Sequence, residues 1–186
     1  MRIISGTMRG TKLFTLEGLN TRPTLDRVKE ALFSKINYDL EGATVLDLFS
    51  GSGALALESL SRGAKFSVMC DSSREAIKII KQNIEKTRTK DKTIVLNSDY
   101  RRALDKLEND KVKFDFIFLD PPYKTDFAVD AIKKIIEKDL LKKYGTIVLE
   151  TDEKEKILNN LDMNLLEIKD IKKYGRIILL FLIRKE

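Results

Sequence analysis

The chain has 186 residues, of which 42% are hydrophobic, and this is long enough to bury one sizeable core. It carries 35 basic and 29 acidic side chains, and the resulting net charge of +6 permits a polyanionic partner without requiring one. It has no histidine and a single cysteine, which excludes histidine-based catalytic triads, histidine metal sites and internal disulfides. We expect a cytoplasmic protein, because the N-terminus lacks a signal-peptide region and no apolar run approaches the ~20 residues that span a bilayer.

The first 40 residues predict a small hairpin followed by a helix. Residues 1–20 alternate short apolar pairs with glycines, which is typical of a hairpin packed on a larger body. Thr24 has the side chain of a helix N-cap, and Pro23 before it ends the preceding extended segment. The helix that follows has an apolar face at helical spacing, formed by Leu25, Val28, Leu32 and Ile36.

A mostly parallel α/β sheet is predicted from Thr44 onward, because strand-like and helix-like patterns alternate. The expected strands are Thr44–Phe49, Phe66–Cys70, Thr93–Leu96, Phe114–Leu119 and Thr146–Leu149. The expected helices are Ala54–Arg62, one capped by Ser72 and Glu75, Tyr100–Leu107, Phe127–Leu140 and Glu153–Leu161. Two final runs, Leu165–Ile171 and Arg176–Ile183, leave no room for a helix between them and predict an antiparallel hairpin. We therefore expect seven strands in one domain over residues 1–186, of which 1–40 form an N-terminal extension.

Residues 49–54, Phe-Ser-Gly-Ser-Gly-Ala, lie between the first strand and its helix and predict a loop that holds a nucleoside-bearing cofactor. Gly51 and Gly53 let the backbone turn tightly and let a ligand approach the main chain. Ala56 stands at the third glycine position of the dinucleotide fingerprint, which argues against a nicotinamide cofactor.

Three carboxylates on successive strands strengthen this prediction. Asp71 ends the second strand, at the spacing expected of an acid that accepts hydrogen bonds from ribose hydroxyls. Asp99 has the equivalent position one strand later and is a candidate acceptor for an adenine amino group. Asp47 lies inside the first strand, where a charge is unfavourable unless it is partnered or faces a ligand. The predicted cofactor contacts are Asp47, Phe49, Ser50, Gly51, Gly53, Asp71, Ser72, Asp99 and Tyr100.

Asp120-Pro121-Pro122-Tyr123, directly after the buried strand Phe114–Leu119, predict a site that holds a flat base. Asp120 offers an acceptor for an exocyclic amine, Tyr123 offers a stacking surface, and the prolines stiffen the backbone between them. Ligands of open α/β sheets collect at the carboxyl ends of strands, where all of these loops begin. We therefore expect the cofactor loop and this loop to serve one reaction.

Two motifs resemble those of the class I S-adenosylmethionine-dependent methyltransferases. Val45–Gly53 resembles their first motif, and Asp120–Tyr123 resembles the fourth motif of those that methylate planar NH₂ nitrogens. Three segments are similar to segments of the RsmD family, the 16S rRNA (guanine(966)-N(2))-methyltransferases. They are Arg9–Leu13, Thr21–Glu30 and Gly51–Leu55. The resemblance covers nearly the whole chain. It implies a Rossmann-like class I methyltransferase fold, S-adenosylmethionine as cofactor, and methylation of a guanine N2 amine in 16S ribosomal RNA.

The groups themselves suggest how such a reaction proceeds. Asp120 can accept one N–H of the amine and the Pro121 carbonyl the other, while Tyr123 stacks on the base. The base must leave its stack, so a loop or helix-end nucleotide is favoured. The candidate RNA contacts are Arg2, Arg9, Lys12, Arg22, Thr24 and Arg27. We expect ribosomal RNA or the assembling small subunit as partner, a monomer, and no metal or membrane partner.

The chemistry of the Asp120 loop does not choose guanine over adenine, or RNA over DNA. A DNA adenine-N6 or cytosine-N4 methyltransferase is therefore the main alternative, although the chain has little room for a separate target-recognition domain. Methylation of a pyrimidine C5 is disfavoured, because it needs a cysteine nucleophile and Cys70 lies on another strand. A nicotinamide-dependent oxidoreductase and a non-catalytic RNA-binding protein with the same fold are further alternatives.

Overall fold

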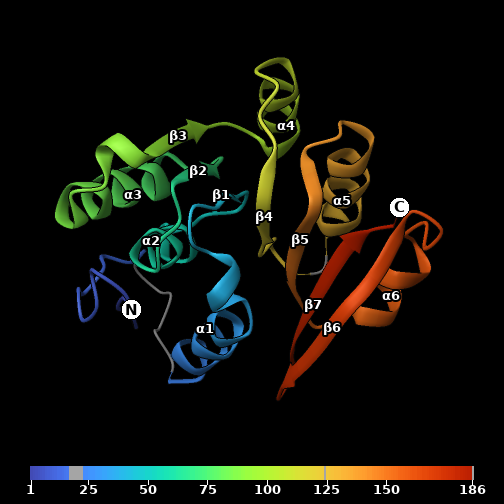
Figure 1. Ribbon diagram of the computed structural model, residues 1–186, viewed down its shortest axis with the longest axis horizontal. Helices are drawn as coiled ribbons and strands as arrows, with labels where there is room; N and C mark the ends of the chain where they lie inside the picture. The colour runs from blue at the N-terminus through green and yellow to red at the C-terminus, as the bar shows by residue number, and fades with distance from the viewer. Residues whose placement is uncertain (17–22, 124, 186) are drawn as a thin grey trace. The chain divides into compact units, whose positions relative to one another are not determined.

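Figure 1 shows the computed structural model, which describes the backbone of residues 1–16, 23–123 and 125–185 and the side chains of all of these but 23–26. The chain forms two compact units, Met1–Asp99 and Tyr100–Glu186. Within the described residues no helix is both long and apolar enough to cross a membrane. The single domain over residues 1–186, with its extension 1–40, stays a prediction.

The first unit contains three parallel strands in the order β3-β2-β1. They are β1 (Thr44–Asp47), β2 (Phe66–Asp71) and β3 (Thr93–Asn97). Its helices are α1 (Pro23–Ile36), α2 (Ala54–Ser61) and α3 (Arg74–Thr87), with short 3-10 helices η1 (Asn37–Asp39) and η2 (Lys90–Lys92). Asp47 is paired with Met69, and Asp71 with Asn97. The carboxyl ends of these strands therefore meet at one edge of the unit.

Both α2 and α3 lie on the same side of these strands (Figure 1). Each follows its strand directly and turns an apolar face inward. In α3 the buried face includes the predicted Ala76, Ile77, Ile80 and Ile84. Val45, Leu46, Val68 and Met69 on the strands are also buried. The α/β alternation of the sequence thus becomes a layer of helices over a parallel sheet, which leaves the loops after the strands to form sites.

The predicted N-terminal hairpin is present in reduced form. Arg2 and Lys12 make an isolated antiparallel bridge rather than two regular strands. The Ile3 N–H donates to the Thr11 carbonyl at 3.0 Å, and the Leu13 N–H donates to the Met1 carbonyl at 3.0 Å. Ile3 and Leu13 are buried, so this segment packs on the unit as expected.

A buried carboxylate fixes the N-terminal segment to α2. Glu58 is fully buried and accepts hydrogen bonds from the backbone N–H groups of Ile4 at 2.8 Å and Ser5 at 3.0 Å. It also pairs with Lys29 of α1 at 3.3 Å and with Arg62 at 2.8 Å. Two buried cations and two backbone donors therefore share one anion, which holds the segment, α1 and α2 together.

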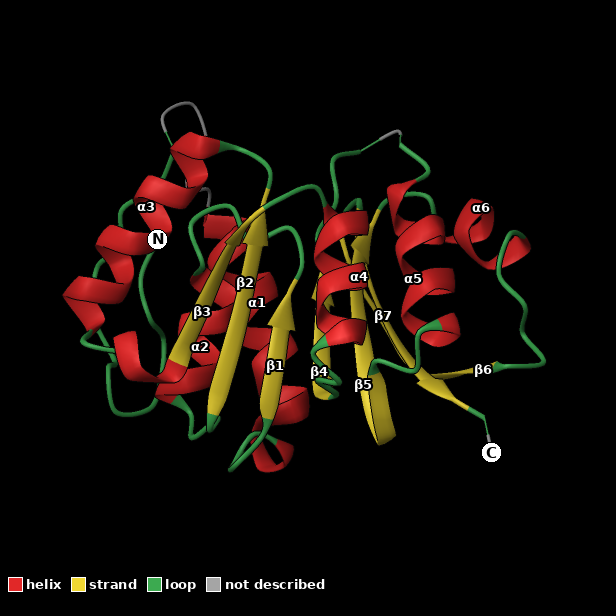
Figure 2. Ribbon diagram, turned by 90° about the horizontal axis from the view of Figure 1, so that it is seen from above, coloured by secondary structure: helices red, strands yellow, loops and turns green. Residues whose placement is uncertain are grey.

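The second unit has the strand order β4-β5-β7-β6. Its strands are β4 (Phe114–Leu119), β5 (Leu141–Thr151), β6 (Leu166–Tyr174) and β7 (Ile177–Arg184). Its helices are α4 (Tyr100–Asn109), α5 (Phe127–Glu137) and α6 (Lys154–Asn159) (Figure 2). β4 and β5 are parallel, whereas β7 is antiparallel to both β5 and β6. The predicted seven strands and antiparallel C-terminal hairpin are confirmed in the described residues.

The predicted Ser72–Glu75 cap is wrong by one residue. The helix α3 begins at Arg74, and Ser73 is its N-cap, since the Ser73 hydroxyl accepts from the Ala76 N–H at 3.3 Å. The reason is local: the Asp71 carboxylate accepts the Ser73 N–H at 2.8 Å and turns the chain one residue later than expected. The predicted helix start at Thr24 is also late by one, because α1 begins at Pro23, a residue well suited to a first helical turn.

Other strand boundaries also differ from the predicted ones: β1 is shorter and β5 is longer. β1 ends at Asp47 instead of Phe49, and β5 begins at Leu141 instead of Thr146. The helix α5 ends at Glu137 rather than Leu140, because the Leu140 carbonyl accepts the Phe114 N–H at 2.9 Å and starts the sheet. In the C-terminal hairpin the strand β6 continues to Tyr174, so residues 172–174 are strand and not connection.

Candidate active site

The loop after β1 is held tightly around its two glycines. The Ser50 N–H donates to the Cys70 carbonyl at 2.9 Å, and the Gly53 N–H donates to the Ser50 carbonyl at 2.7 Å. Gly51 has φ +55° with open space where a Cβ would lie, and Gly53 has φ +78° at the N-terminus of α2. Such backbone angles favour glycine, so the loop leaves main-chain atoms accessible to a ligand.

Asp47 ends β1 as a buried carboxylate that is only partly satisfied. It is 1% exposed, and its Oδ2 has no hydrogen-bond partner among the described residues. Burial raises the pKa of Asp47 to about 7, and the nearby Ser50 hydroxyl and Ala56 backbone N–H oppose this shift only in part. The Ser50 hydroxyl is itself buried without a hydrogen-bond partner in the described structure. An unsatisfied acceptor and an unsatisfied hydroxyl beside a glycine loop are the features expected of a site for a ligand with polar groups.

Asp71 ends β2 and joins the glycine loop to the start of α3. Its Oδ2 accepts the Gly51 N–H at 2.9 Å, and its Oδ1 accepts the Ser73 N–H at 2.8 Å. A carboxylate can accept about four hydrogen bonds, so Asp71 still has acceptor sites for ribose hydroxyls. Its role as ribose acceptor stays a prediction, whereas its role in shaping the loop is observed.

The three predicted cofactor acids surround one buried thiol. Burial and then the negative charges of Asp71, Asp47 and Asp99 raise the pKa of Cys70 to about 12. The Cys70 thiol lies 3.4 Å from the Ser98 carbonyl, and the Ser98 N–H donates to the Asp71 carbonyl at 3.1 Å. These contacts bring the loop that carries Asp99 beside the Asp71 loop. They also keep Cys70 a protonated, inaccessible thiol, which argues against a cysteine nucleophile.

Two further predicted cofactor contacts differ in their surroundings. Ser72 is exposed beside Asp71, as a ligand contact requires. Tyr100 is buried, and its hydroxyl donates to Asp130 at 2.7 Å while its ring lies 5.2 Å from that of Phe127. The Tyr100 side chain thus packs α4 against α5, and a cofactor contact from this residue is left to its backbone. Phe49 is half-buried within the loop.

The Asp120–Tyr123 loop follows β4 and exposes the side chains of Asp120 and Tyr123. Asp120 is exposed, Pro121 is buried, and Tyr123 is 52% exposed. The Thr125 hydroxyl donates to the Pro122 carbonyl at 2.8 Å and closes the turn. A Tyr123 buried in the core would have indicated a purely structural loop, so its exposed ring supports the predicted stacking surface.

Glu150 of β5 belongs to this loop and was not predicted from the sequence. The Tyr123 hydroxyl donates to Glu150 Oε1 at 3.3 Å. Burial raises the pKa of Glu150, and this hydrogen bond opposes the shift. Burial and then the carboxylates of Glu150, Asp120 and Asp152 raise the pKa of Tyr123. The loop is therefore an acidic surface with one oriented aromatic ring, suited to a ligand that donates hydrogen bonds.

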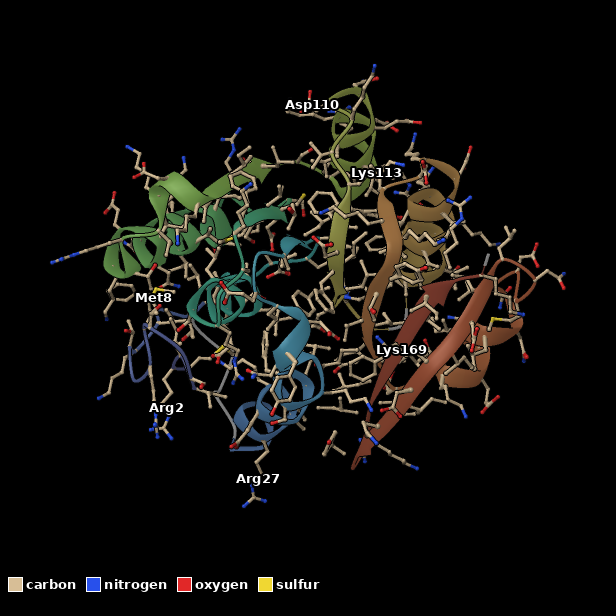
Figure 3. All side chains as sticks on the ribbon, in the orientation of Figure 1. Arg2, Met8, Arg27, Asp110, Lys113 and Lys169 are labelled. Atoms are coloured by element: carbon tan, nitrogen blue, oxygen red, sulfur yellow. The ribbon has the colours of Figure 1, made fainter. Side chains whose placement is uncertain are left out.

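Four of the predicted RNA contacts are exposed on the first unit. Arg2, Arg9 and Arg27 line a hollow of about 410 Å³, together with Gly10 and Glu30. Figure 3 shows the side chains of Arg2 and Arg27 directed away from the ribbon. Lys12 is exposed and bridged to Arg2 through the backbone. Arg22 and the side chain of Thr24 lie outside what the structure describes.

A buried asparagine connects the N-terminal segment with the glycine loop. Asn83 of α3 is fully buried, and its amide donates to the carbonyls of Phe14 at 3.0 Å and Ser52 at 2.9 Å. Its oxygen accepts the Phe14 N–H at 2.8 Å. The sequence carried a signal that was missed, because Asn83 lies three residues after Ile80, on the apolar face of its helix.

The comparisons with known proteins agree with this arrangement. The sequence pattern of the family described as Conserved hypothetical protein 95 matches residues 1–183. Ribosomal RNA small subunit methyltransferase D of Haemophilus influenzae is 34% identical over 170 residues, 91% of this chain and 88% of its own length. YlbH of Bacillus subtilis, whose name marks it as an unproven rRNA methyltransferase, is 39% identical over 152 residues, 82% of this chain and 83% of its own.

A solved structure gives the same result for the fold. The Escherichia coli protein yhhF, named as an unproven methyltransferase, superimposes with a TM-score of 0.85 at 27% identity and covers 100% of this chain and 98% of its own. The predicted Rossmann-like class I methyltransferase fold is therefore confirmed. With the glycine loop after β1, the Asp-Pro-Pro-Tyr loop after β4 and a match over nearly all of its length, the chain belongs to the Conserved hypothetical protein 95 family, that of ribosomal RNA small subunit methyltransferase D (RsmD).

Proposed function

We propose that the protein transfers a methyl group from S-adenosylmethionine to the exocyclic N2 amine of a guanine in small-subunit ribosomal RNA. Membership of a family whose curated relatives are named ribosomal RNA methyltransferases supports the reaction class. The observation that carries the proposal is the exposed Asp120–Tyr123 loop, which joins an acceptor and an aromatic ring at the end of a buried strand. A ribosomal RNA substrate would place this activity in the cytoplasm.

The residues after β1 and β2 fit the proposed cofactor. S-adenosylmethionine supplies an electrophilic methyl group on a sulfonium, together with an amino acid and a nucleoside to be held. The unpartnered Asp47 Oδ2 and Ser50 hydroxyl suit its polar groups, and the open side of Gly51 leaves room for close approach. Asp71 retains acceptor sites for ribose hydroxyls.

Asp120 and Tyr123 are proposed to prepare the amine. The lone pair of an exocyclic amine is delocalised into its ring, so the amine is a weak nucleophile. Two acceptors, the Asp120 carboxylate and the Pro121 carbonyl, would hold its N–H groups in fixed directions and favour a lone pair free for attack. The carboxylate also offsets the positive charge that develops on nitrogen. Stacking of the base on Tyr123 would contribute about 1–3 kcal/mol.

The experiment compares Asp120→Ala with the control variant Asp126→Ala. Both variants remove an exposed carboxylate from the segment between β4 and α5. We expect Asp120→Ala to lower methyl transfer to small-subunit RNA by at least about a hundredfold, because positioned acceptors contribute that much. Calorimetry should show S-adenosylmethionine binding close to wild type in both variants, and Asp126→Ala should keep its turnover. Wild-type turnover by Asp120→Ala would contradict the proposed role of the loop.

The methylated product tests the proposed base. Nucleoside analysis of the RNA should yield N2-methylguanosine, whereas a methylated adenine or cytosine would contradict the guanine assignment. The DNA alternative is not favoured, because the curated relatives are named for ribosomal RNA. Methylation of duplex DNA in preference to ribosomal RNA would instead support the DNA methyltransferase alternative.

A further inference from the structure

The tetrapeptide Lys-Lys-Tyr-Gly occurs twice in the second unit, at residues 142–145 and 172–175. The first copy lies at the start of β5 and the second at the end of β6, beside the turn to β7. The two copies carry the same charges. They differ in their position in the sheet, and this position determines which parts of a ligand each copy can reach.

The second copy lies at the same edge of the sheet as the Asp120 loop. β5 is parallel to β4 and antiparallel to β7, and β7 is antiparallel to β6, so β4, β5 and β6 all run in one direction. Their C-terminal ends therefore share an edge. The first copy, at the N-terminal end of β5, lies at the opposite edge.

The strand register makes this placement quantitative. Leu119 is paired with Leu149, Glu150 with Leu179, and Leu179 with Lys172. Lys172 is thus level with Glu150, the residue that accepts from Tyr123. Three strand spacings separate β4 from β6, which is about 14 Å at ~4.8 Å each. A short stretch of single-stranded RNA can span that distance.

The turn at the end of β6 concentrates positive charge. Lys172, Lys173 and Arg176 are exposed within five residues, and Tyr174 is paired with Ile177 across the tight turn. Lys172 lies 3.5 Å from Asp170. Among the described residues no acidic side chain pairs with Lys173 or Arg176. Figure 1 shows β6 and β7 meeting at this tip, at the far end from the C-terminus.

We propose that the β6–β7 tip, defined as Lys172, Lys173 and Arg176, binds RNA phosphates that flank the nucleotide held by Asp120 and Tyr123. The inference rests on the proposed function and adds a second RNA surface to the N-terminal one. The Asp120 loop is itself acidic and repels phosphates, so a cationic anchor on the same edge supplies the attraction that the loop lacks.

Lysines on an outer strand also have a plain explanation, since they protect the free edge against pairing with another chain. Lys169, on β6 before the tip, fits that explanation equally well. The two explanations differ in what they predict, because edge protection does not require the lysines to contribute to RNA binding. The first copy of the tetrapeptide, on the inner strand β5, supplies a control with the same charges.

The test compares the double variant Lys172→Ala/Lys173→Ala with the double variant Lys142→Ala/Lys143→Ala. Each removes two positive charges from the same tetrapeptide. The tip variant breaks the surface ion pair of Lys172 with Asp170 at 3.5 Å, and the control variant breaks that of Lys142 with Asp115 at 2.8 Å. Binding to a transcript of small-subunit ribosomal RNA is measured from 0.05 to 1 M KCl, at roughly even steps of log salt.

For single-stranded RNA, two phosphate contacts add about 1.4 to the slope of log affinity against log salt concentration. The tip variant should lose that much slope. If the two proteins bind equally at 1 M salt, it should therefore bind about 25-fold more weakly than the wild type at 0.1 M. The control variant should keep the wild-type slope. Equal losses in both variants, or no loss in either, would overturn the proposal. So would normal RNA binding with weakened binding to isolated small-subunit particles, because the tip would then contact a ribosomal protein. Methyl transfer by the wild type is scored separately, and its absence would count against the proposed function rather than against the tip.

Discussion

Replacement of Asp47 by asparagine tests the reasoning about the cofactor loop most directly. Burial raises the pKa of Asp47 from 3.8 to about 7 in the folded protein. Each unit of difference between the folded and unfolded pKa corresponds to about 1.4 kcal/mol, so the ionised carboxylate destabilises the folded protein by about 4 kcal/mol at pH 8. The penalty is absent below the unfolded pKa, grows as the pH rises, and is complete once the pH passes the folded pKa. Between pH 5.5 and 8 it grows by about 2 kcal/mol.

The assay is urea denaturation of the wild type and of Asp47→Asn at pH 5.5 and pH 8, without cofactor. The buried amide of the variant is also unsatisfied. At a single pH, the difference in free energy of unfolding between the two proteins therefore combines the cost of burying this amide with the cost of ionising Asp47. The change in that difference between the two pH values isolates the ionisation of Asp47. It also cancels other groups, such as Glu150, whose pKa burial likewise raises. We expect the variant to gain about 2 kcal/mol relative to wild type on going from pH 5.5 to 8.

The same variant should lose affinity for S-adenosylmethionine, because the neutral amide no longer offers a carboxylate to the cofactor. Asp47 must be ionised to serve as that acceptor, so the wild-type affinity should rise with pH up to about 7 and then level off. A relative gain in stability below 0.5 kcal/mol, or unchanged cofactor affinity, would refute the reasoning that an unsatisfied buried acid marks the cofactor site.

Three further predictions concern the first unit. Glu58→Gln should lower the free energy of unfolding by about 3–5 kcal/mol, measured by urea denaturation, because it leaves buried Lys29 and Arg62 uncompensated; a loss under 1 kcal/mol would contradict the described network. Gly53→Ala should lower the free energy of unfolding by about 1–2 kcal/mol and weaken cofactor binding in calorimetry, because φ is +78° and the new Cβ would lie 3.0 Å from Met69 Sδ. A variant with wild-type stability and wild-type cofactor affinity would contradict this prediction. Asn83→Ala should speed hydrogen exchange at the Phe14 N–H, which loses its acceptor, while exchange in β2 stays slow.

Much of the fold could be predicted from the sequence, because apolar runs of strand length alternate with helical periodicity. The strand Phe114–Leu119 was predicted to the residue, since an apolar run interrupted only by Asp115 ends there in a charged residue and two prolines. β5 was predicted to begin five residues too late, at Thr146 instead of Leu141. Its start, Lys142-Lys143-Tyr144-Gly145, has the composition of a turn, yet Leu141 before it is already paired with Phe114 of β4. Long-range pairing of this kind leaves no local signal.

The candidate site was predictable where a residue type is unusual for its position, as with Asp47 in a buried strand. Ser73 was missed as the cap because the Asp71 carboxylate turns the chain, and a side-chain contact to the backbone cannot be read from spacing. Glu150 was missed because its significance arises only when the parallel pairing of β4 and β5 brings it to Tyr123. Residues that depend on two distant segments are the ones that single-sequence reasoning does not find.

The buried polar residues of the first unit fix the positions of backbone segments. Replacing a buried ionic network by apolar side chains is often neutral or stabilising, so the cluster at Glu58 is not explained by stability alone. What it does is fix the backbone of Ile4 and Ser5 on α2, the helix that starts at the glycine loop. Asn83 adds a direct connection from Phe14 to Ser52 within that loop. The segment that carries the predicted RNA contacts is therefore held by the same elements that shape the predicted cofactor site, and a substitution in either network should disturb both RNA and cofactor binding.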